Sequence, residues 1–148
     1  MNKLWYAATS IAFGCGAALA QVVPDVGPVS LQEIAERQAA PLTREEVLRL
    51  VSGANVEWAS FGEGERRWTN DAGGQFWATR IGGPGSFNPH HKSGKGKWEV
   101  RDDAAYCVQL DYGHMMIEGW CWTFFAANGR ILMNMVPAVP GSKIRIYR

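Results

Sequence analysis

Residues 105–124 read AYCVQLDYGHMMIEGWCWTF, and this stretch decides the fold. Apolar and aromatic residues alternate with small or polar ones on both sides of Gly113-His114, a pattern typical of two antiparallel strands joined by a tight turn. Direct pairing of Cys107 with Cys121 centres that turn on His114 and requires an odd-numbered loop, for which Gly113 supplies a left-handed position. The stretch therefore predicts a β-hairpin closed by a disulfide.

This register sorts the hairpin residues onto two faces. The more apolar and aromatic face should line the core and carries Tyr106, Val108, Leu110, Trp120, Trp122 and Phe124. The opposite face carries Ala105, Cys107, Gln109, Ile117, Gly119, Cys121 and Thr123. A redox pair would want a Cys-x-x-Cys spacing or a charge that activates one thiol, and the sequence shows neither. The disulfide is therefore predicted to be structural, stabilising the fold by about 3 kcal/mol through the restricted unfolded chain.

The first twenty residues read as a secretory signal peptide. Lys3 precedes an apolar run that ends in Ala18-Leu19-Ala20, a small-residue cleavage site. The run is shorter than the ~20 apolar residues of a spanning helix, so a retained anchor is the weaker alternative. A lipoprotein cut before Cys15 is a second alternative, although the bulky Phe13 suits that site poorly. Cleavage leaves Cys107 and Cys121, and we expect a periplasmic or secreted protein with no membrane span.

Charge argues against two classes of partner. The chain has 15 lysines and arginines against 14 acids, and removal of residues 1–20 takes away Lys3 and no acid. A neutral mature chain lacks the electrostatic drive toward phosphate backbones, so nucleic acid is not expected as a partner. Attraction to a membrane surface is equally unsupported. Residues 21–148 are enough for one domain with a substantial core.

Two helices are predicted before the strands. Ser30 and Glu33 have capping-box spacing and begin a short helix through about Ala39 within an N-terminal extension, residues 21–40. Thr43 and Glu46 repeat the capping box after Pro41, and Gly53 ends this second helix. Its stripe of Val47, Leu48 and Val51 should dock on a sheet.

From residue 41 to residue 148 the chain is expected to form a β domain. Short apolar stretches separated by turn-forming pairs such as Asn128-Gly129 predict eight antiparallel strands. Their expected ranges are 55–60, 65–70, 75–81, 97–101, 105–110, 115–124, 130–135 and 143–147. The fold class is therefore mainly β with a short N-terminal helical segment, an antiparallel meander curling into a small barrel or sandwich, and one hairpin disulfide.

Several of these features together resemble a known family. They are Leu-Thr-x-x-Glu at 42–46, Leu50-x-x-Gly53, Asp71-Ala72-Gly73-Gly74, Gly-Lys-Trp-Glu-Val at 96–100, Tyr106-Cys107-Val108 and Trp120-Cys121-Trp122. Their order over about residues 41–135 is similar to that in the DUF995 family of small secreted proteobacterial proteins, a domain of unknown function. The resemblance implies a periplasmic β domain with a paired cysteine and brings no catalytic residues. The long insert from Gly82 to Gly96 departs from the family pattern.

That insert is the best candidate for a binding segment. Gly82 to Gly96 is too rich in Gly, Pro and Ser for a strand, and binding residues collect on loops that a rigid sheet supports. The candidate binding residues are Phe87, His90 and His91 in the loop, with Trp77 and Trp98 beside it. The expected ligand is an unknown protein, a peptide or a small apolar molecule of the cell envelope. Most such composition simply reports flexibility, so a mobile, solvated connection is the favoured reading of the segment itself, and the binding role is the functional candidate beside it.

Catalytic and cofactor motifs are missing from the sequence. There is no Gly-x-Ser-x-Gly, phosphate loop or His-Glu-x-x-His, and His90 and His91 lack a nearby third metal ligand. No metal or other cofactor is expected. A non-catalytic binding or inhibitor module is therefore the first hypothesis. The alternative is an envelope-polymer hydrolase that uses His114 or carboxylates such as Glu57, Glu63, Glu99 and Glu118.

Overall fold

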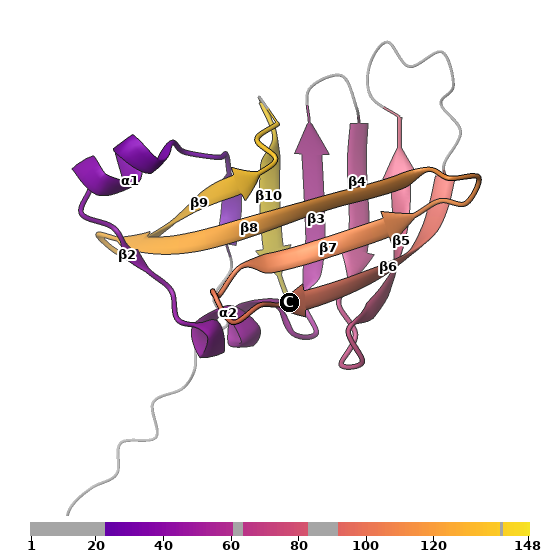
Figure 1. The fold of residues 1–148 in the computed structure, drawn as a ribbon, viewed down its shortest axis with the longest axis horizontal. Helices are drawn as coiled ribbons and strands as arrows, with labels where there is room; N and C mark the ends of the chain where they lie inside the picture. Colours follow the sequence, from indigo (N-terminus) through magenta and orange to yellow (C-terminus); the bar gives the residue numbers. More distant parts are fainter. Residues whose placement is uncertain (1–22, 61–63, 83–91, 140) are drawn as a thin grey trace, which may run out of the picture.

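The computed structural model describes residues 23–60, 64–82, 92–139 and 141–148. They form two short helices and ten antiparallel strands. The strands make one curled sheet, a half-barrel (Figure 1). The strands are β1 Val23–Val26, β2 Ala40–Pro41, β3 Asn55–Ser60, β4 Gly64–Thr69, β5 Gln75–Ile81, β6 Lys92–Val100, β7 Tyr106–Asp111, β8 Ile117–Ala127, β9 Arg130–Val136 and β10 Lys143–Tyr147. The helices are α1 Leu31–Glu36 and α2 Arg44–Val51.

Neighbouring strands in the sheet mostly follow one another along the chain. The order is β1-β10-β3-β4-β5-β6-β7-β8-β2, and β9 pairs with β8. The curl brings β7 and β8 across from β10, β3 and β4, as Figure 1 shows. Inward side chains from the two walls therefore meet, and the ring centroids of Trp58 on β3 and Trp120 on β8 lie 4.2 Å apart. The predicted mainly β fold is confirmed.

The hairpin that decides the fold has the predicted register. Cys107 pairs directly with Cys121, and the two cysteines are disulfide-bonded. The turn is the odd-numbered loop Gly113–Met115, in which all three residues have positive φ, and the amide of Tyr112 donates to the carbonyl of Met116. The aromatic face is buried, including Trp122, Tyr106 and Phe124 at 0% exposure. The predicted division into a core face and a thinner face is confirmed.

Both predicted helices form. Thr43 caps α2 through the full capping box with Glu46, and the helix buries Val47, Leu50 and Val51. The α1 helix begins after Ser30, whose hydroxyl accepts from the Glu33 amide, and it ends at Glu36, earlier than the predicted Ala39. No helix in the described part of the chain has the length and apolar character that crossing a membrane requires.

Two short strands were not predicted. β1 pairs with β10, and its Val23 is buried in the core, so part of the expected N-terminal extension belongs to the sheet. β2 pairs with the far end of β8 through Ala40 and Pro41. Both strands are too short to show an alternating pattern, and β2 contains a proline, which sequence reasoning treats as a strand breaker.

The glycine-rich insert is partly strand. Residues 92–96 were predicted as loop but belong to β6. The prediction failed because two of the glycines in this segment are needed for close packing of the strand and not for flexibility. A Cβ added at Gly94 would lie 2.7 Å from the carbonyl oxygen of Asp111, and one at Gly96 would lie 2.0 Å from the Phe76 ring. These glycines allow neighbours to approach the strand closely, a role that composition alone reads as flexibility.

Candidate functional site

β8 extends beyond the strand that covers one of its sides. It pairs with β7 through residues 117–122 and with β9 through residues 121–127. β9 ends at Val136, opposite Cys121. Residues Ile117–Trp120 therefore face no described strand on the β9 side, and we call this segment the β8 edge.

The hydrogen-bonding direction along the β8 edge follows from the register. In an antiparallel ladder, residues alternate between pointing their N–H and C=O to one neighbour and to the other. At the hairpin end the amide of Tyr112 donates to the carbonyl of Met116, and farther along the amide of Leu42, next to β2, donates to the carbonyl of Phe124. The N–H and C=O groups of even-numbered β8 residues therefore point to the side where β7 and β2 lie. The N–H and C=O groups of Ile117 and Gly119 consequently point toward the uncovered side.

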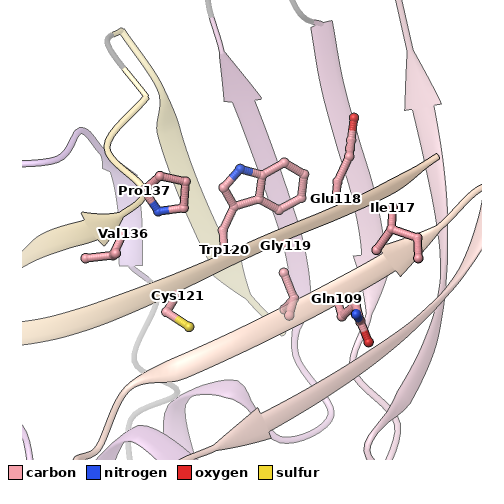
Figure 2. Close-up of a pocket in the computed structure, with 9 residues that line it drawn as sticks. Gln109, Ile117, Glu118, Gly119, Trp120, Cys121, Val136 and Pro137 are labelled. Carbon is pink, nitrogen blue, oxygen red and sulfur yellow. The ribbon is translucent and has the colours of Figure 1, made fainter. Parts of the chain in front are cut away.

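A hollow lies along this edge. It has a volume of about 430 Å³, within the range of small-ligand pockets. Figure 2 shows the residues around it, with Val136 and Pro137 at the end where β9 stops. We call it the β8 hollow. The residues that line it are Val108, Gln109, Ile117, Glu118, Gly119, Trp120, Cys121, Val136 and Pro137. Gly119 contributes no side chain, so the backbone forms part of the floor.

Apolar side chains around the hollow are exposed. Ile117 is 59% exposed and Val136 is 64% exposed, and both lie on the outer face of the sheet. Met115, in the adjoining turn, is 98% exposed. Single exposed apolar residues are ordinary, but a group of them beside a hollow is characteristic of a binding surface.

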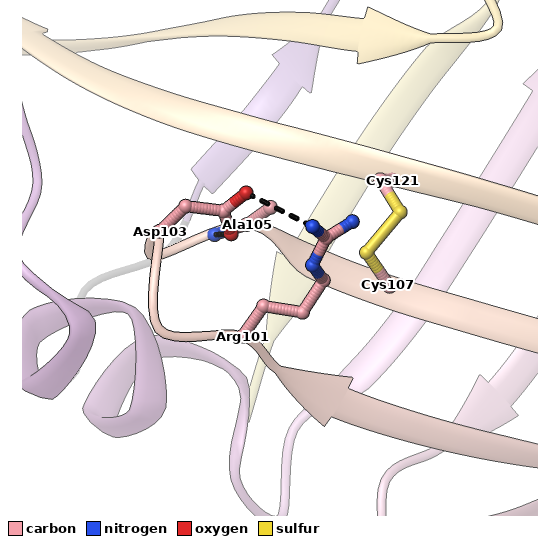
Figure 3. The surroundings of a disulfide bond; sticks show 5 residues. All are labelled: Arg101, Asp103, Ala105, Cys107 and Cys121. Carbon is pink, nitrogen blue, oxygen red and sulfur yellow. Dashed lines mark hydrogen bonds and ion pairs between the residues drawn. A yellow bond between two sulfur atoms is a disulfide. The ribbon is translucent and has the colours of Figure 1, made fainter.

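The disulfide holds one end of the β8 edge. Cys121 is the first β8 residue after the uncovered segment, and its bond to Cys107 ties β8 to β7 at that point. Figure 3 shows the bond beside the tight turn between β6 and β7, where Arg101 pairs with Asp103 at 3.3 Å. Asp103 also accepts from the amide of Ala105. The disulfide and this turn therefore hold β7 and β8 in place at one end of the hollow.

A buried ion pair holds the other end. The guanidinium of Arg66, on β4, donates to Glu118 through Nε at 3.1 Å and Nη2 at 2.8 Å. Arg80, on β5, reaches the same carboxylate at 3.3 Å. The Arg66 side chain is 0% exposed, which is rare for arginine and requires a paired charge. These contacts connect β8 to the opposite wall of the half-barrel.

Aromatic rings complete the support. The Arg66 guanidinium lies 4.5 Å from the Trp58 ring centroid and 5.4 Å from that of Trp120. Cation–π contacts of this kind strengthen when water is excluded. Tyr112 lies nearby, and burial, assisted by the negative charge of Glu118, raises its pKa to about 12. Tyr112 therefore stays a neutral phenol even at pH values where an ordinary tyrosine begins to ionise.

The predicted binding residues are spread over different environments. Trp77 is 65% exposed on the outer face, with Lys95 5.5 Å from its ring centroid. Trp98 is 9% exposed and donates from Nε1 to the Asp71 carbonyl, so little of it can meet a partner. Phe87, His90 and His91 lie outside the described residues. Their binding roles remain predictions.

The groups named for a hydrolase do not converge in the described structure. His114 is exposed in the β7–β8 turn. Glu57 lies on the outer face with Arg145 and Tyr147, whereas Glu118 points inward to Arg66. Glu63 lies outside the described residues. Within the described segments, no cluster of three or more His, Cys, Asp or Glu side chains has a metal-binding arrangement.

Sequence reasoning missed the β8 hollow, although two signals pointed to it. The Asn128-Gly129 turn sets which β9 residue faces each β8 residue, so the end of β9 near Pro137 predicts an uncovered β8 segment. Arg66 shares the inward face of its strand with Trp68, which signals a buried charge in need of a partner. Comparison of the chain with protein-family models, curated proteins and solved structures finds no match, so the DUF995 resemblance stays a prediction.

Proposed function

We propose that this chain is an exported, non-catalytic binding or inhibitor module that captures its ligand in the β8 hollow. One observation carries the proposal: a mostly apolar hollow of about 430 Å³ borders a strand segment whose backbone edge faces no strand among the described residues. Exposed Ile117 and Val136 flank it, and a disulfide and an ion pair brace it. A rigid, preformed surface binds more tightly because less freedom is lost on association.

The chemistry of the lining supports binding more than turnover. Glu118 is the ionisable side chain among the lining residues, and its carboxylate oxygens are engaged by Arg66 and Arg80. A carboxylate held between two guanidiniums is suited to fixing β8 in place. The ligand classes that match the remaining lining are a protein, a peptide or a small apolar molecule of the envelope.

Export belongs to the proposal and has its own test. The signal-peptide pattern predicts a mature chain that begins at Gln21 and carries the Cys107–Cys121 disulfide in the periplasm or outside the cell. Intact-mass analysis of the protein from its own cells should show this N-terminus and no lipid on Cys15. A retained leader would contradict the export proposal.

A charge placed in the hollow should weaken capture strongly. We expect Val136→Asp to weaken ligand binding by at least about tenfold, because an unpaired carboxylate would have to be desolvated. The measurement is recovery of bound material when the purified protein is incubated with an extract of its own cell envelope. Leu31→Asp is the matched control, since Leu31 is 68% exposed on α1 and lies outside the hollow lining. Equal recovery with both variants would reject the hollow as the site.

A further inference from the structure

We propose that the occupant of the β8 hollow is an extended, uncharged peptide segment that adds to β8 as an antiparallel strand. The inference rests on the proposed function and names its ligand class. The segment would take the path that β9 leaves at Val136 and would pair with the backbone of Ile117 and Gly119.

The backbone geometry favours a peptide over a small apolar molecule. Ile117 and Gly119 each direct one N–H and one C=O toward the hollow, which places donors and acceptors at alternate positions along a strand. Another extended backbone presents the complementary pattern at the same spacing. An apolar small molecule would cover these groups without pairing them, which carries an energetic cost.

The dimensions define how much peptide binds. Four residues of β8, Ile117–Trp120, lie between the end of β9 and the turn at Gly113–Met115. At about 3.3 Å per residue, this edge accommodates about four residues of partner. An antiparallel direction continues the run of β9 and gives the straighter hydrogen bonds of antiparallel pairing.

The lining specifies the side chains of the peptide. A partner residue opposite Gly119 would place its side chain on the outer face, over a position that has no side chain of its own. Ile117 and Val136 flank that position, so an apolar side chain is favoured there. Because Glu118 already pairs with Arg66 and Arg80, the lining offers no ready counter-ion, and an uncharged side chain is favoured there.

The test uses blocked peptides of sequence Thr-Thr-X-Thr-Thr, in which X is Val, Leu, Ile or Phe, and the same peptide with Asp at X. Amide hydrogen exchange of the full purified protein is followed by NMR. We expect the apolar peptides to slow exchange at Ile117 and Gly119 and the Asp peptide to have no effect. No slowing at these two amides under peptide saturation would overturn the inference.

Two variants at Gly119 separate backbone pairing from filling of the hollow. Gly119→Pro removes an N–H that faces the hollow and no ladder bond to β7, and it should weaken peptide binding by at least about tenfold. Gly119→Ala is the comparison variant. It keeps the N–H and its Cβ would lie 3.4 Å from the Val108 carbonyl oxygen, but the Cβ occupies part of the space over Gly119, so a smaller loss of affinity than for proline is expected. Equal affinities of the two variants would also overturn the inference. If the proline variant does not fold, the exchange measurement on the unmodified protein decides.

Two further readouts distinguish other occupants. N-Phenyl-1-naphthylamine, an uncharged apolar dye, is tested against the unmodified protein and Val136→Asp. Dye binding that Val136→Asp abolishes, without peptide binding, would keep the proposed function and reject the peptide. Failure of both probes would count against both proposals. Concentration-dependent dimers with Ile117 and Gly119 already protected would assign the edge to a second copy and reject the inference.

Discussion

Replacing Glu118 with alanine is expected to lower the free energy of unfolding by about 3–5 kcal/mol, because the buried guanidinium of Arg66 would lose two hydrogen bonds and the negative charge of Glu118. The Arg66 side chain is 0% exposed and donates two hydrogen bonds to Glu118. Urea unfolding of the oxidised protein, followed by tryptophan fluorescence, measures the loss.

The chain offers a close control in Glu57. Its side chain is 19% exposed against 18% for Glu118, and it also pairs with two arginines. Those arginines, Arg67 and Arg145, are 54% and 46% exposed, so Glu57→Ala should cost no more than about 1 kcal/mol. Similar losses for the two variants would show that the burial of Arg66 does not set the cost.

Trp122→Ala is the second substitution with a large expected effect. Trp122 is 0% exposed, and its ring centroid lies 5.4 Å from that of Tyr106, 6.4 Å from Trp120 and 6.5 Å from Trp68. Its removal would leave a cavity in a close-packed aromatic core and should cost about 3–5 kcal/mol in the same unfolding experiment.

Trp77→Ala makes the same chemical change on the surface. Trp77 is 65% exposed and its described ring contact is with Lys95, so the expected loss is below about 1 kcal/mol. A loss at Trp77 as large as that at Trp122 would contradict the assignment of the two faces. Because the Trp77 variant should stay folded, it also tests directly whether this exposed ring contributes to ligand binding.

The elements with strong local patterns could be predicted from the sequence. The alternation on either side of Gly113 set the register of the cysteines, and the capping box at Thr43 set the start of α2. The strand at residues 92–96 could not be predicted. Gly96 is required there because the Phe76 ring of the neighbouring strand leaves no room for a side chain. Such a contact exists only after the sheet has assembled.

The site depends on relations between elements that are distant in sequence. The β8 edge exists because β9 stops at Val136 while β7 continues to Asp111. The bracing of that edge depends on Arg66 meeting Glu118, which requires the sheet to curl until β4 faces β8. Local patterns predicted the eight longer strands but not β1 and β2, and the three-dimensional curl and the unequal strand lengths created the site.

The central claim is that the β8 edge is a rigid strand whose backbone is uncovered on one side. Amide hydrogen exchange of the free protein, resolved by NMR, tests this claim most directly. We predict slow exchange at Glu118 and Trp120, whose N–H groups point to β7, and fast exchange at Ile117 and Gly119, whose N–H groups point to the hollow. Uniform protection of the four amides would mean that the edge is already covered, and uniform fast exchange would mean that it is not a held strand.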